Sequence, residues 1–356
     1  MINPRSLPLP LVRAACVLLA AGVLAACGGP EEGAVRDGRL AALPIAADSV
    51  TVSGISAGGN MAVQFHVAHS ALVHGAGVLA AGPYYCAENS LRLALGRCMQ
   101  GDEAIPVDEL ATITSQLALE EVIDPIAELS GDRVWIFHGG ADPVIARTVV
   151  DATEAYYATL VDPRGIQRVE LEQAGHTFPA TGPGLQACDQ TDTPFIGECG
   201  LDGARQMLEH LYGPFAAAAA AVAPGQLLPF SQADYAAADA SSLAARGWLY
   251  VPAACGGAGA AGRCRLHVAF HGCKQGQSYV QDAFVRRAGY LAAADAGSIV
   301  VLFPQIEPSY QPLNPNGCWD WWGYSGEAYA TRLGPQIVAI KAMVDDLLGA
   351  RVAKRP

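Results

Sequence analysis

Residues 48–60 read DSVTVSGISAGGN, in which a β-branched run stops at a serine between glycines and helix-forming residues follow. The five residues Gly54-Ile55-Ser56-Ala57-Gly58 fit the pattern G-x-S-x-G, a sharp strand-to-helix turn that lifts a serine hydroxyl above a sheet in a strained conformation. The hydroxyl then lies near a helix N-terminus, whose free N–H groups favour negative charge. Ser56 is therefore the candidate nucleophile, and a glycine-rich turn that only contains a serine is the alternative.

The composition is typical of a well-buried globular enzyme, since hydrophobic residues make up 51% and charged residues 16% of the 356 residues. This length allows one large domain or two small ones. The net charge is −12 and the sequence has no clustered basic run. We therefore expect no nucleic-acid partner, because phosphate binding needs a basic face.

The first 26 residues predict a signal peptide. Arg5 and Arg13 precede an apolar run at residues 14–26, which is too short to span a bilayer comfortably. The run ends in Leu24-Ala25-Ala26-Cys27, which resembles a bacterial lipobox with Cys27 as the lipidated residue. The alternative is an ordinary secretory signal that is cleaved nearby. Both interpretations predict export, to the outside, to the periplasm or to the outer membrane as a lipoprotein.

The cysteines predict disulfides. The chain has ten, and eight remain when Cys16 is assigned to the signal and Cys27 to the lipid. An even number in an exported protein indicates disulfide bonds. Cys273 and Cys318 form a longer-range couple, and the others form local couples: Cys86 with Cys98, Cys188 with Cys199, and Cys255 with Cys264. Zinc is the rival interpretation, but C-x-x-C pairs and His clusters at ligand spacing are missing, so we expect no metal.

A polar tether is expected at residues 27–46, followed by a single catalytic domain at 47–350. In this domain the pattern alternates between strands and helices, which predicts an α/β fold with a mostly parallel central sheet covered by helices on both faces. Predicted strands lie at residues 48–53, 75–81, 133–138, 167–171, 247–251, 265–270 and 298–303. Predicted helices lie at 59–70, 147–160, 279–296 and 327–348, with a helical excursion at about 86–130. An alanine run at 216–223 is a domain boundary, a helix end or a connector.

A nucleophilic serine needs a base and an orienting carboxylate, and in α/β-hydrolases the chain order is Ser, Asp or Glu, then His. Asp142 follows the predicted strand at 133–138, and His176 follows the strand at 167–171. The alternatives are a turn or N-cap residue for Asp142 and an ordinary loop histidine for His176. His267 is expected to point out from its strand. Packing or solvated roles are expected for all the other histidines considered: His66, His69, His74, His138, His210 and His267.

The oxyanion hole of this fold takes one N–H from the residue after the nucleophile, here Ala57, and a second from a loop after an early strand that is often marked by His-Gly. No such motif precedes Ser56, but Phe270-His271-Gly272-Cys273 occurs far downstream. The strand and helix pattern of residues 265–349 is the one that normally comes before the serine strand. Joining residue 348 to residue 48 restores the usual order, so the chain is predicted to be a circularly permuted α/β-hydrolase.

Four stretches, at residues 52–62, 81–86, 270–273 and 316–321, resemble the extracellular poly(3-hydroxybutyrate) depolymerases, most closely the permuted single-domain type first known from fungi. The likeness covers nearly all of residues 47–349. It implies a catalytic triad of Ser56, Asp142 and His176. It also implies an oxyanion hole formed by the N–H groups of Ala57 and Cys273, and a disulfide between Cys273 and Cys318.

The resemblance implies hydrolysis of poly(3-hydroxybutyrate) or its oligomers to monomers and dimers through an acyl-enzyme, with no cofactor, and we expect a monomer. Cleft-lining aromatics are expected among Trp319, Trp321, Trp322, Tyr84 and Tyr85, for which core packing is the alternative. The sequence shows no separate polymer-adsorption domain, so an exposed apolar patch would have to bind the polymer. The rival functions are a carboxylesterase for short acyl, aryl or feruloyl-type esters and a non-catalytic polymer-binding surface lipoprotein.

Overall fold

The computed structural model describes residues 33–215, 224–235, 241–256 and 264–350. They belong to one compact unit that spans residues 33–356. The predicted signal peptide, Cys27 and the alanine run at 216–223 lie outside the described residues. None of the helices within the described ranges is long and apolar enough to cross a bilayer.

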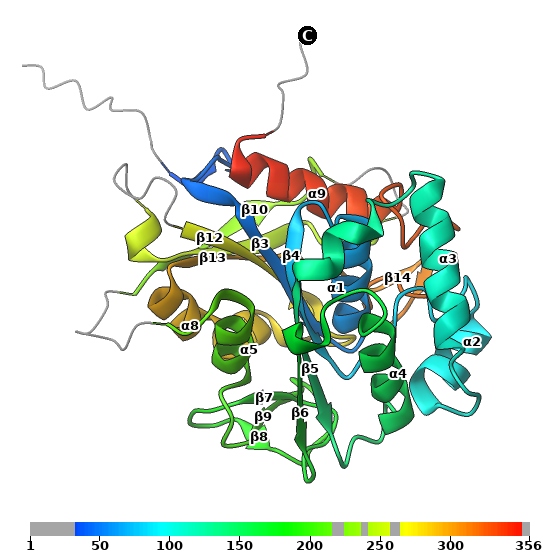
Figure 1. Ribbon diagram of the computed structural model, residues 1–356. Coiled ribbons are helices and arrows are strands. Elements are labelled where there is room, and N and C mark those ends of the chain that lie inside the picture. Colours follow the sequence, from blue (N-terminus) through cyan, green and yellow to red (C-terminus); the bar gives the residue numbers. More distant parts are fainter. Residues whose placement is uncertain (1–32, 216–223, 236–240, 257–263, 351–356) are drawn as a thin grey trace, which may run out of the picture. The chain divides into compact units, whose positions relative to one another are not determined.

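An eight-stranded sheet forms the centre of the unit (Figure 1). All neighbouring strands are parallel except that β11 runs antiparallel to both of its neighbours. In order across the sheet the strands are β10 (Gln226–Ser231), β11 (Arg246–Val251), β13 (Ile299–Phe303), β12 (Cys264–Phe270), β3 (Ile45–Ile55), β4 (Val73–Leu79), β5 (Arg133–Gly139) and β6 (Ile166–Leu171).

The strand order confirms the circular permutation. The early strand β3 lies in the middle of the sheet, where it pairs in parallel with the late strand β12 on one side and with β4 on the other. The last helix, α9 (Pro335–Leu348), returns to the start of this strand, because the N–H of Leu43 donates to the carbonyl oxygen of Leu347 at 2.9 Å. The end of the α/β pattern therefore lies beside its beginning.

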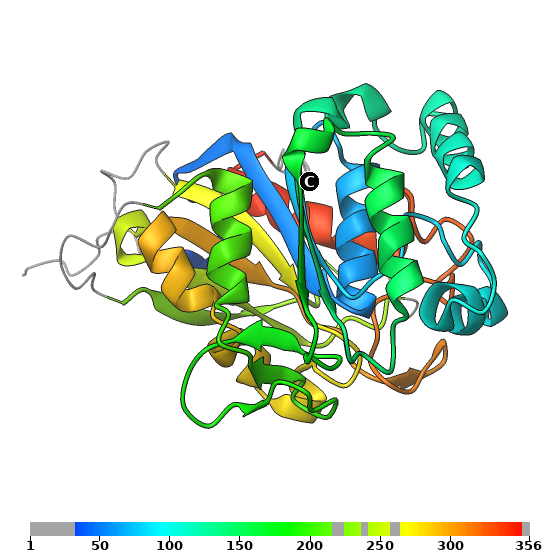
Figure 2. The ribbon, with the colours of Figure 1, turned by 60° about the horizontal axis from the view of Figure 1, so that its bottom comes forward.

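Helices cover both faces of the sheet (Figure 2). Along β3 the side chains alternate, so that Val50 and Val52 belong to one buried cluster and Ile55 to the other. The first cluster includes side chains of α1 (Ala57–Ala68), α4 (Arg147–Tyr157) and α9, and the second includes side chains of α5 (Gly203–Tyr212), α7 (Ala283–Arg287) and α8 (Tyr290–Gly297).

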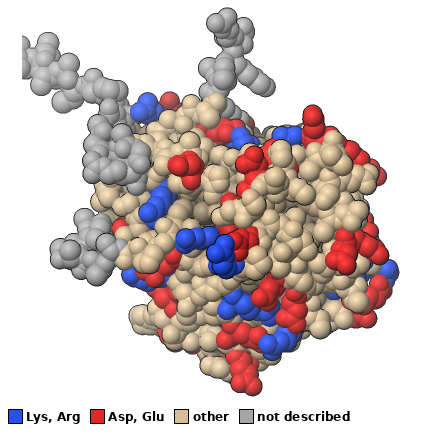
Figure 3. Space-filling view, in the orientation of Figure 1, with Lys and Arg blue, Asp and Glu red and all other residues tan. Residues whose placement is uncertain are grey.

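Burial of these two clusters stabilises the fold more than surface charge does. Each large apolar side chain that is fully buried contributes about 1.5–3 kcal/mol. On the face shown in Figure 3, basic side chains lie beside acidic ones, with uncharged areas between them. Exposed ion pairs contribute only about 0–1 kcal/mol each.

Three predicted segments differ from the structure. The helix predicted at 279–296 is divided into α6 (Gln277–Val280), α7 and α8, because Gln281 and Gly289 have positive φ values of 56° and 90°. The helix predicted at 327–348 begins only at Pro335, whose fixed φ suits a first helical position.

The third difference concerns the predicted tether at residues 27–46. Its described part, from residue 33 on, contains the short hairpin of β1 (Val35–Arg36) and β2 (Arg39–Leu40) and the first residues of β3.

Other segments connect the strands of the central sheet. The excursion after β4 contains α2 (Leu91–Leu95), a π-helical turn (Gly96–Gln100), α3 (Val107–Leu119) and a 3-10 turn (Ile126–Gly131). A small sheet follows β6 and consists of β7 (Phe178–Ala180), β8 (Gln186–Ala187) and β9 (Ile196–Glu198). A hairpin follows β13 and consists of β14 (Ser309–Tyr310) and β15 (Leu313–Asn314). Short 3-10 turns lie at Pro163–Gly165 and Ala253–Cys255.

Four disulfides join the eight cysteines in the couples that their spacing indicated: Cys86–Cys98, Cys188–Cys199, Cys255–Cys264 and Cys273–Cys318. Disulfides form and persist in oxidising compartments outside the cytosol. The protein is therefore of an exported type.

Candidate active site

Ser56 lies at a strained turn between β3 and α1. Its φ of 58° and ψ of −126° are a conformation that residues other than glycine rarely adopt. The turn is held by its own neighbours, since the N–H of Ser56 donates to the carbonyl of Leu79 at 2.9 Å and the side-chain amide of Asn60 donates to the carbonyl of Ser56 at 3.3 Å. Strain of about 1–3 kcal/mol is offset by such contacts and is frequent at functional sites.

The glycines of the pattern allow this turn to close. A Cβ atom on Gly54 would lie 2.2 Å from the carbonyl oxygen of Gly58, a distance at which the backbone would have to shift. The serine turn therefore requires glycine at position 54, because there is no space for a side chain there, as the sequence pattern implies.

The late His-Gly-Cys loop lies beside the early serine. It follows the end of β12, and a Cβ atom on Gly272 would lie 3.5 Å from the Cβ atom of Ser56. The N–H of Gly272 donates to the side-chain oxygen of the buried Gln275 at 2.7 Å, and the next residue, Cys273, is bound to Cys318. Ala57 and Cys273 both line one cavity together with Ser56.

Asp142 and His176 contact each other directly. The Oδ2 atom of Asp142 lies 2.7 Å from the Nδ1 atom of His176. The Oδ1 atom accepts hydrogen bonds from the N–H groups of Val144 and Ile145 at 2.7 and 2.9 Å. One oxygen of Asp142 thus closes a turn, while the other faces the imidazole. Its side chain is fully buried, which strengthens the hydrogen bond to His176.

The small sheet after β6 holds His176 in place. The N–H of His176 donates to Oγ1 of Thr191 at 2.8 Å, and the imidazole packs edge-on against the ring of Phe195. The preceding residue, Gly175, donates its N–H to the carbonyl of Cys188 at 2.9 Å, and Cys188 is in turn bound to Cys199. The sequence did not reveal this support, because the strands concerned are only two or three residues long.

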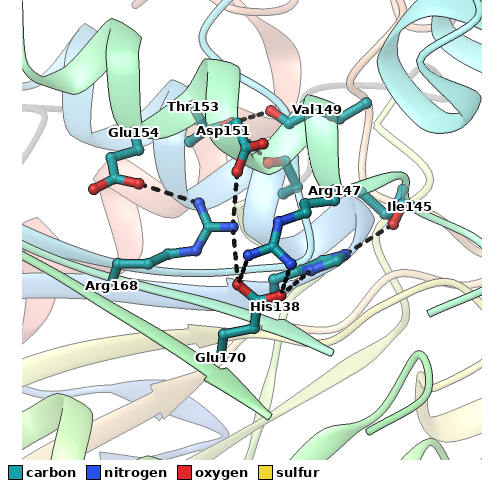
Figure 4. Close-up of polar contacts among 10 residues, drawn as sticks. His138, Ile145, Arg147, Val149, Asp151, Thr153, Glu154, Arg168 and Glu170 are labelled. Atoms are coloured by element: carbon teal, nitrogen blue, oxygen red, sulfur yellow. Dashed lines mark hydrogen bonds and ion pairs between the residues drawn. The ribbon is translucent and has the colours of Figure 1, made fainter. Parts of the chain in front are cut away.

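Polar contacts among β5, β6 and the start of α4, drawn in Figure 4, support the segment that follows Asp142. His138 is buried as a packing residue, in agreement with its predicted role, and its Nε2 atom donates to the carbonyl of Ile145 at 3.2 Å. Arg147, at the start of α4, pairs with Glu170 of β6. Nearby, Arg168 pairs with Asp151 at 3.0 Å and with Glu154 at 3.2 Å, which ties α4 to β6.

The buried histidines outside this group have structural roles. His66 lies between the hydroxyl of Tyr157 and the carboxylate of Asp132, at 3.1 and 3.0 Å. His267 does not point out from its strand as expected, because it is completely buried, with its Nε2 atom 2.6 Å from the hydroxyl of Ser53. Burial lowers the pKa of His267 to about 3, so the ring is neutral, and this serine–histidine contact lies in the core, away from solvent.

Ser56, Ala57, His176 and Cys273 line a cavity of about 630 Å³. Most of its walls are apolar, and they include Ile55, Leu91, Leu95, Met99, Val144, Ile145, Phe195, Leu313, Trp321 and Trp322. A concave apolar site with a few convergent polar groups is the usual form of a ligand pocket. The sequence did not identify the contributions of α2 and β15 to these walls.

Two of the five predicted aromatics line this cavity, namely Trp321 and Trp322. Trp319 does not, because it is completely buried against Phe270 and His271.

The predicted cleft roles of Tyr84 and Tyr85 are not met either, since neither lines the cavity. Tyr84 is buried and donates its hydroxyl to the carbonyl of Ala330 at 2.9 Å. Tyr85 stacks on the ring of Tyr329.

Asp320 determines which way the tryptophan loop turns. Its buried carboxylate accepts N–H groups from four residues that follow it, Trp322, Gly323, Tyr324 and Ser325, and the hydroxyl of Ser325 at 2.6 Å. Burial raises the pKa of Asp320, although these donors act against that effect. The loop is thereby wrapped around one side chain, which leaves Trp319 in the core and Trp322 at the cavity.

No protein-family model matches the chain. The chain is 42% identical, over 329 residues, to a poly(3-hydroxybutyrate) depolymerase of Delftia acidovorans, a match that covers 92% of this chain and 64% of that relative's length. It is 32% identical, over 321 residues, to a polyhydroxybutyrate depolymerase of Talaromyces funiculosus, with 87% of this chain and 92% of the relative covered.

Solved structures show the same likeness. The crystal structure of PHB depolymerase from Penicillium funiculosum has a TM-score of 0.80 and 31% identity, over 88% of this chain and 100% of that one. A serine-to-alanine variant of PHB depolymerase in complex with an R3HB trimer also has a TM-score of 0.80, with 30% identity and the same coverage. With its permuted sheet and these similarities, the chain belongs to the polyhydroxybutyrate depolymerase family.

Proposed function

We propose that the protein is an exported serine esterase that hydrolyses poly(3-hydroxybutyrate) or its oligomers to monomers and dimers of hydroxybutyrate. The observation that carries this proposal is the hydrogen bond of 2.7 Å between Asp142 and His176, with His176 and Ser56 lining the same cavity. Support comes from the two relatives named as depolymerases of this polyester and from the solved relative that holds an R3HB trimer.

In the proposed mechanism the hydroxyl of Ser56 attacks an ester carbonyl while the Nε2 atom of His176 takes its proton. Asp142 accepts the hydrogen bond from Nδ1, which fixes the tautomer of the imidazole and stabilises the imidazolium that forms. His176 then protonates the leaving alcohol. A water molecule, deprotonated by the same imidazole, releases the hydroxy acid from Ser56.

The N–H groups of Ala57 and Cys273 are proposed to bind the oxyanion. Ala57 is the first residue of α1, so its N–H has no hydrogen-bond partner inside the helix. This N–H lies at the positive end of the helix dipole, which favours negative charge. Cys273 follows Gly272, and a Cβ atom added to Gly272 would lie 3.5 Å from the Cβ atom of Ser56. Losing one such donor typically lowers turnover by about 10²–10³-fold.

The mouth of the cavity suits a solid polyester. Leu91, Leu95 and Leu313 line the cavity and are also 46%, 52% and 60% exposed. Contiguous exposed apolar side chains at a pocket mark an interaction surface. We infer that this rim, formed by α2 and β15, contacts the polymer surface, and that the apolar walls contact the methyl groups of the chain.

The nucleophile is tested with Ser56→Ala and with Ser115→Ala as a matched control on α3. Soluble hydroxybutyrate oligomers are the substrate and mass spectrometry of released monomer is the measurement. Ser56→Ala is expected to lose at least about 10⁴-fold in kcat because no other group attacks the ester. Retention of hydrolysis by this variant would refute the assignment.

A substrate panel tests the specificity. Polymer film, soluble oligomers, p-nitrophenyl esters and feruloyl esters are compared by kcat/KM. Preference for an aryl or feruloyl ester over the oligomers would replace the proposed function by a general carboxylesterase. Failure of Ser56 to react with a fluorophosphonate probe would instead indicate a non-catalytic, polymer-binding protein.

The lipoprotein anchor is a separate proposal that rests on Leu24-Ala25-Ala26-Cys27, which lies outside the described residues. Metabolic labelling with a palmitate analogue is expected to label the wild-type protein and not Cys27→Ser. Labelling that persists in Cys27→Ser would place the lipid elsewhere. Size-exclusion chromatography of the protein without residues 1–27 tests the expected monomer.

A further inference from the structure

One charged side chain stands out in the cavity. Among the described residues that line it there is no Asp or Glu, and Lys274 is the single Lys or Arg. The chain as a whole is acidic, with 34 Asp and Glu against 22 Lys and Arg. A permanent positive charge in a largely apolar cavity favours a ligand that carries a negative charge.

The backbone of Lys274 is fixed beside the proposed oxyanion hole. Its N–H donates to the carbonyl of Asn316 at 2.8 Å, and its φ is 56°, a left-handed conformation. The residue before it, Cys273, is bound to Cys318, and the residue after it, Gln275, accepts a hydrogen bond from Gly272. The lysine side chain therefore begins one residue away from the N–H that is proposed to hold the reacting oxygen.

The ammonium group of Lys274 is free to bind a ligand. It forms no ion pair or side-chain hydrogen bond with any described residue, and Lys274 is exposed. By contrast, Lys341 on α9 pairs with both carboxylate oxygens of Asp345, at 2.7 and 2.8 Å. Asn316, which binds the backbone of Lys274, is also exposed and lines the same cavity.

An oligomer of a hydroxy acid carries one ionised group, the carboxylate at its acid end. In every ester bond of such a chain this end lies on the side of the leaving alcohol. We propose that Lys274 binds this free carboxylate and thereby makes the protein prefer soluble oligomers that are cut near their acid end. The inference rests on the proposed function, since it names the residue that binds the charged end of that same substrate.

The test compares a hydroxybutyrate trimer as the free acid with its methyl ester, which has the same internal ester bonds but no charge; cleavage of these internal bonds is followed by mass spectrometry. For the wild-type protein kcat/KM is expected to be higher for the acid, through KM. In Lys274→Gln this ratio of acid to methyl ester is expected to fall by about three- to ten-fold, as for the loss of a partly exposed charge-assisted contact. Lys274→Arg keeps the charge and is expected to keep the preference.

Lys341→Gln provides the matched control, because it removes the same charge from a lysine that does not line the cavity. An equal fall of the ratio in Lys341→Gln would overturn the inference in favour of a general charge effect. An equal ratio in the wild type and in Lys274→Gln would also overturn it, while leaving the proposed function intact. If neither trimer is hydrolysed, the proposed function itself fails.

Discussion

Gly58 of the serine turn lies so close to Phe270 at the end of β12 that a Cβ atom on the glycine would stand 2.3 Å from the carbonyl oxygen of Phe270. The same atom would stand 2.4 Å from the carbonyl oxygen of His271. The two segments are remote in sequence but lie at the ends of two adjacent parallel strands, in which Phe270 pairs with Gly54. This close packing places the His-Gly-Cys loop beside Ser56.

Gly58→Ala is therefore expected to push the two segments apart. The clash is with backbone atoms, which cannot rotate away, so the cost in stability is expected to be about 1–3 kcal/mol. Movement of the Cys273 amide would lower kcat by about 10²-fold. The kinetics with soluble oligomers and the thermal midpoint are measured, and Gly131→Ala is the control because a Cβ there meets nothing within 4 Å. Wild-type kcat in Gly58→Ala would contradict the packing argument.

The catalytic candidates could be predicted because they follow strand ends. Ser56 comes directly after β3, Asp142 and His176 lie in the loops that follow β5 and β6, and the carboxyl ends of parallel strands meet at one edge of a sheet. Strand periodicity and a short motif were therefore enough to bring these residues together. The permutation was also predictable, because the His-Gly motif occurs on the wrong side of the serine in the sequence.

Features that depend on individual side-chain contacts could not be predicted. The cluster Trp319-Asp320-Trp321-Trp322 reads as one aromatic loop, and only the bonds to Asp320 decide which rings reach the cavity. The first of the two breaks in the helix predicted at 279–296 lies at Gln281, which is not a residue that usually adopts a positive φ. The supports of His176 lie in the loop between β8 and β9, two strands that are too short to give a periodic signal.

The disulfide between Cys273 and Cys318 is expected to affect turnover as well as stability. It closes a sequence separation of 45 residues, so removing it as a double serine variant should cost about 4 kcal/mol by chain entropy. Since Cys273 belongs to the proposed oxyanion hole, kcat should also fall by about 10²-fold.

The bond between Cys255 and Cys264 is the matched control, with a separation of nine residues and no contact with the cavity. Its removal should cost about 3 kcal/mol of stability and leave kcat unchanged. Equal kcat in the two double variants, measured where both are folded, would exclude the positioning role of the first bond.

Stability is expected to depend on pH through His74. The carboxylate of Asp132, whose Oδ1 atom lies 3.8 Å from Nδ1 of His74, raises the pKa of His74. Burial raises the pKa of Asp132, but the side chains of His66 and His74 outweigh this effect and hold it below its usual value. A histidine with a raised folded-state pKa stabilises fully below its unfolded pKa of about 6.5, and this contribution is lost as the pH rises through the folded-state value.

The thermal midpoint of His74→Gln is therefore expected to fall furthest below that of the wild type under about pH 6.5, and the difference should shrink at higher pH. His210 is expected to show the opposite dependence of stability on pH, because burial lowers its pKa. Its contribution is present above about pH 6.5 and is lost as the pH falls, so the difference between the wild type and His210→Gln should shrink towards acid pH. A difference that is independent of pH in His74→Gln would show that the Asp132 contact is not ionic.

Contact with solid polymer is expected to depend on the apolar rim of the cavity, and Leu313→Asp tests this. Leu313 is 60% exposed on β15, so a carboxylate there leaves the core intact and places a hydrated charge where the polyester would be contacted. We expect the rate on polymer film to fall several-fold more than kcat/KM for a neutral methyl-ester oligomer. Leu119→Asp is the control, because Leu119 is 86% exposed on α3 and does not line the cavity. If both variants lose film hydrolysis equally, adsorption follows from the overall surface rather than from the rim, whereas loss in Leu313→Asp alone assigns it to the leucines at the cavity mouth.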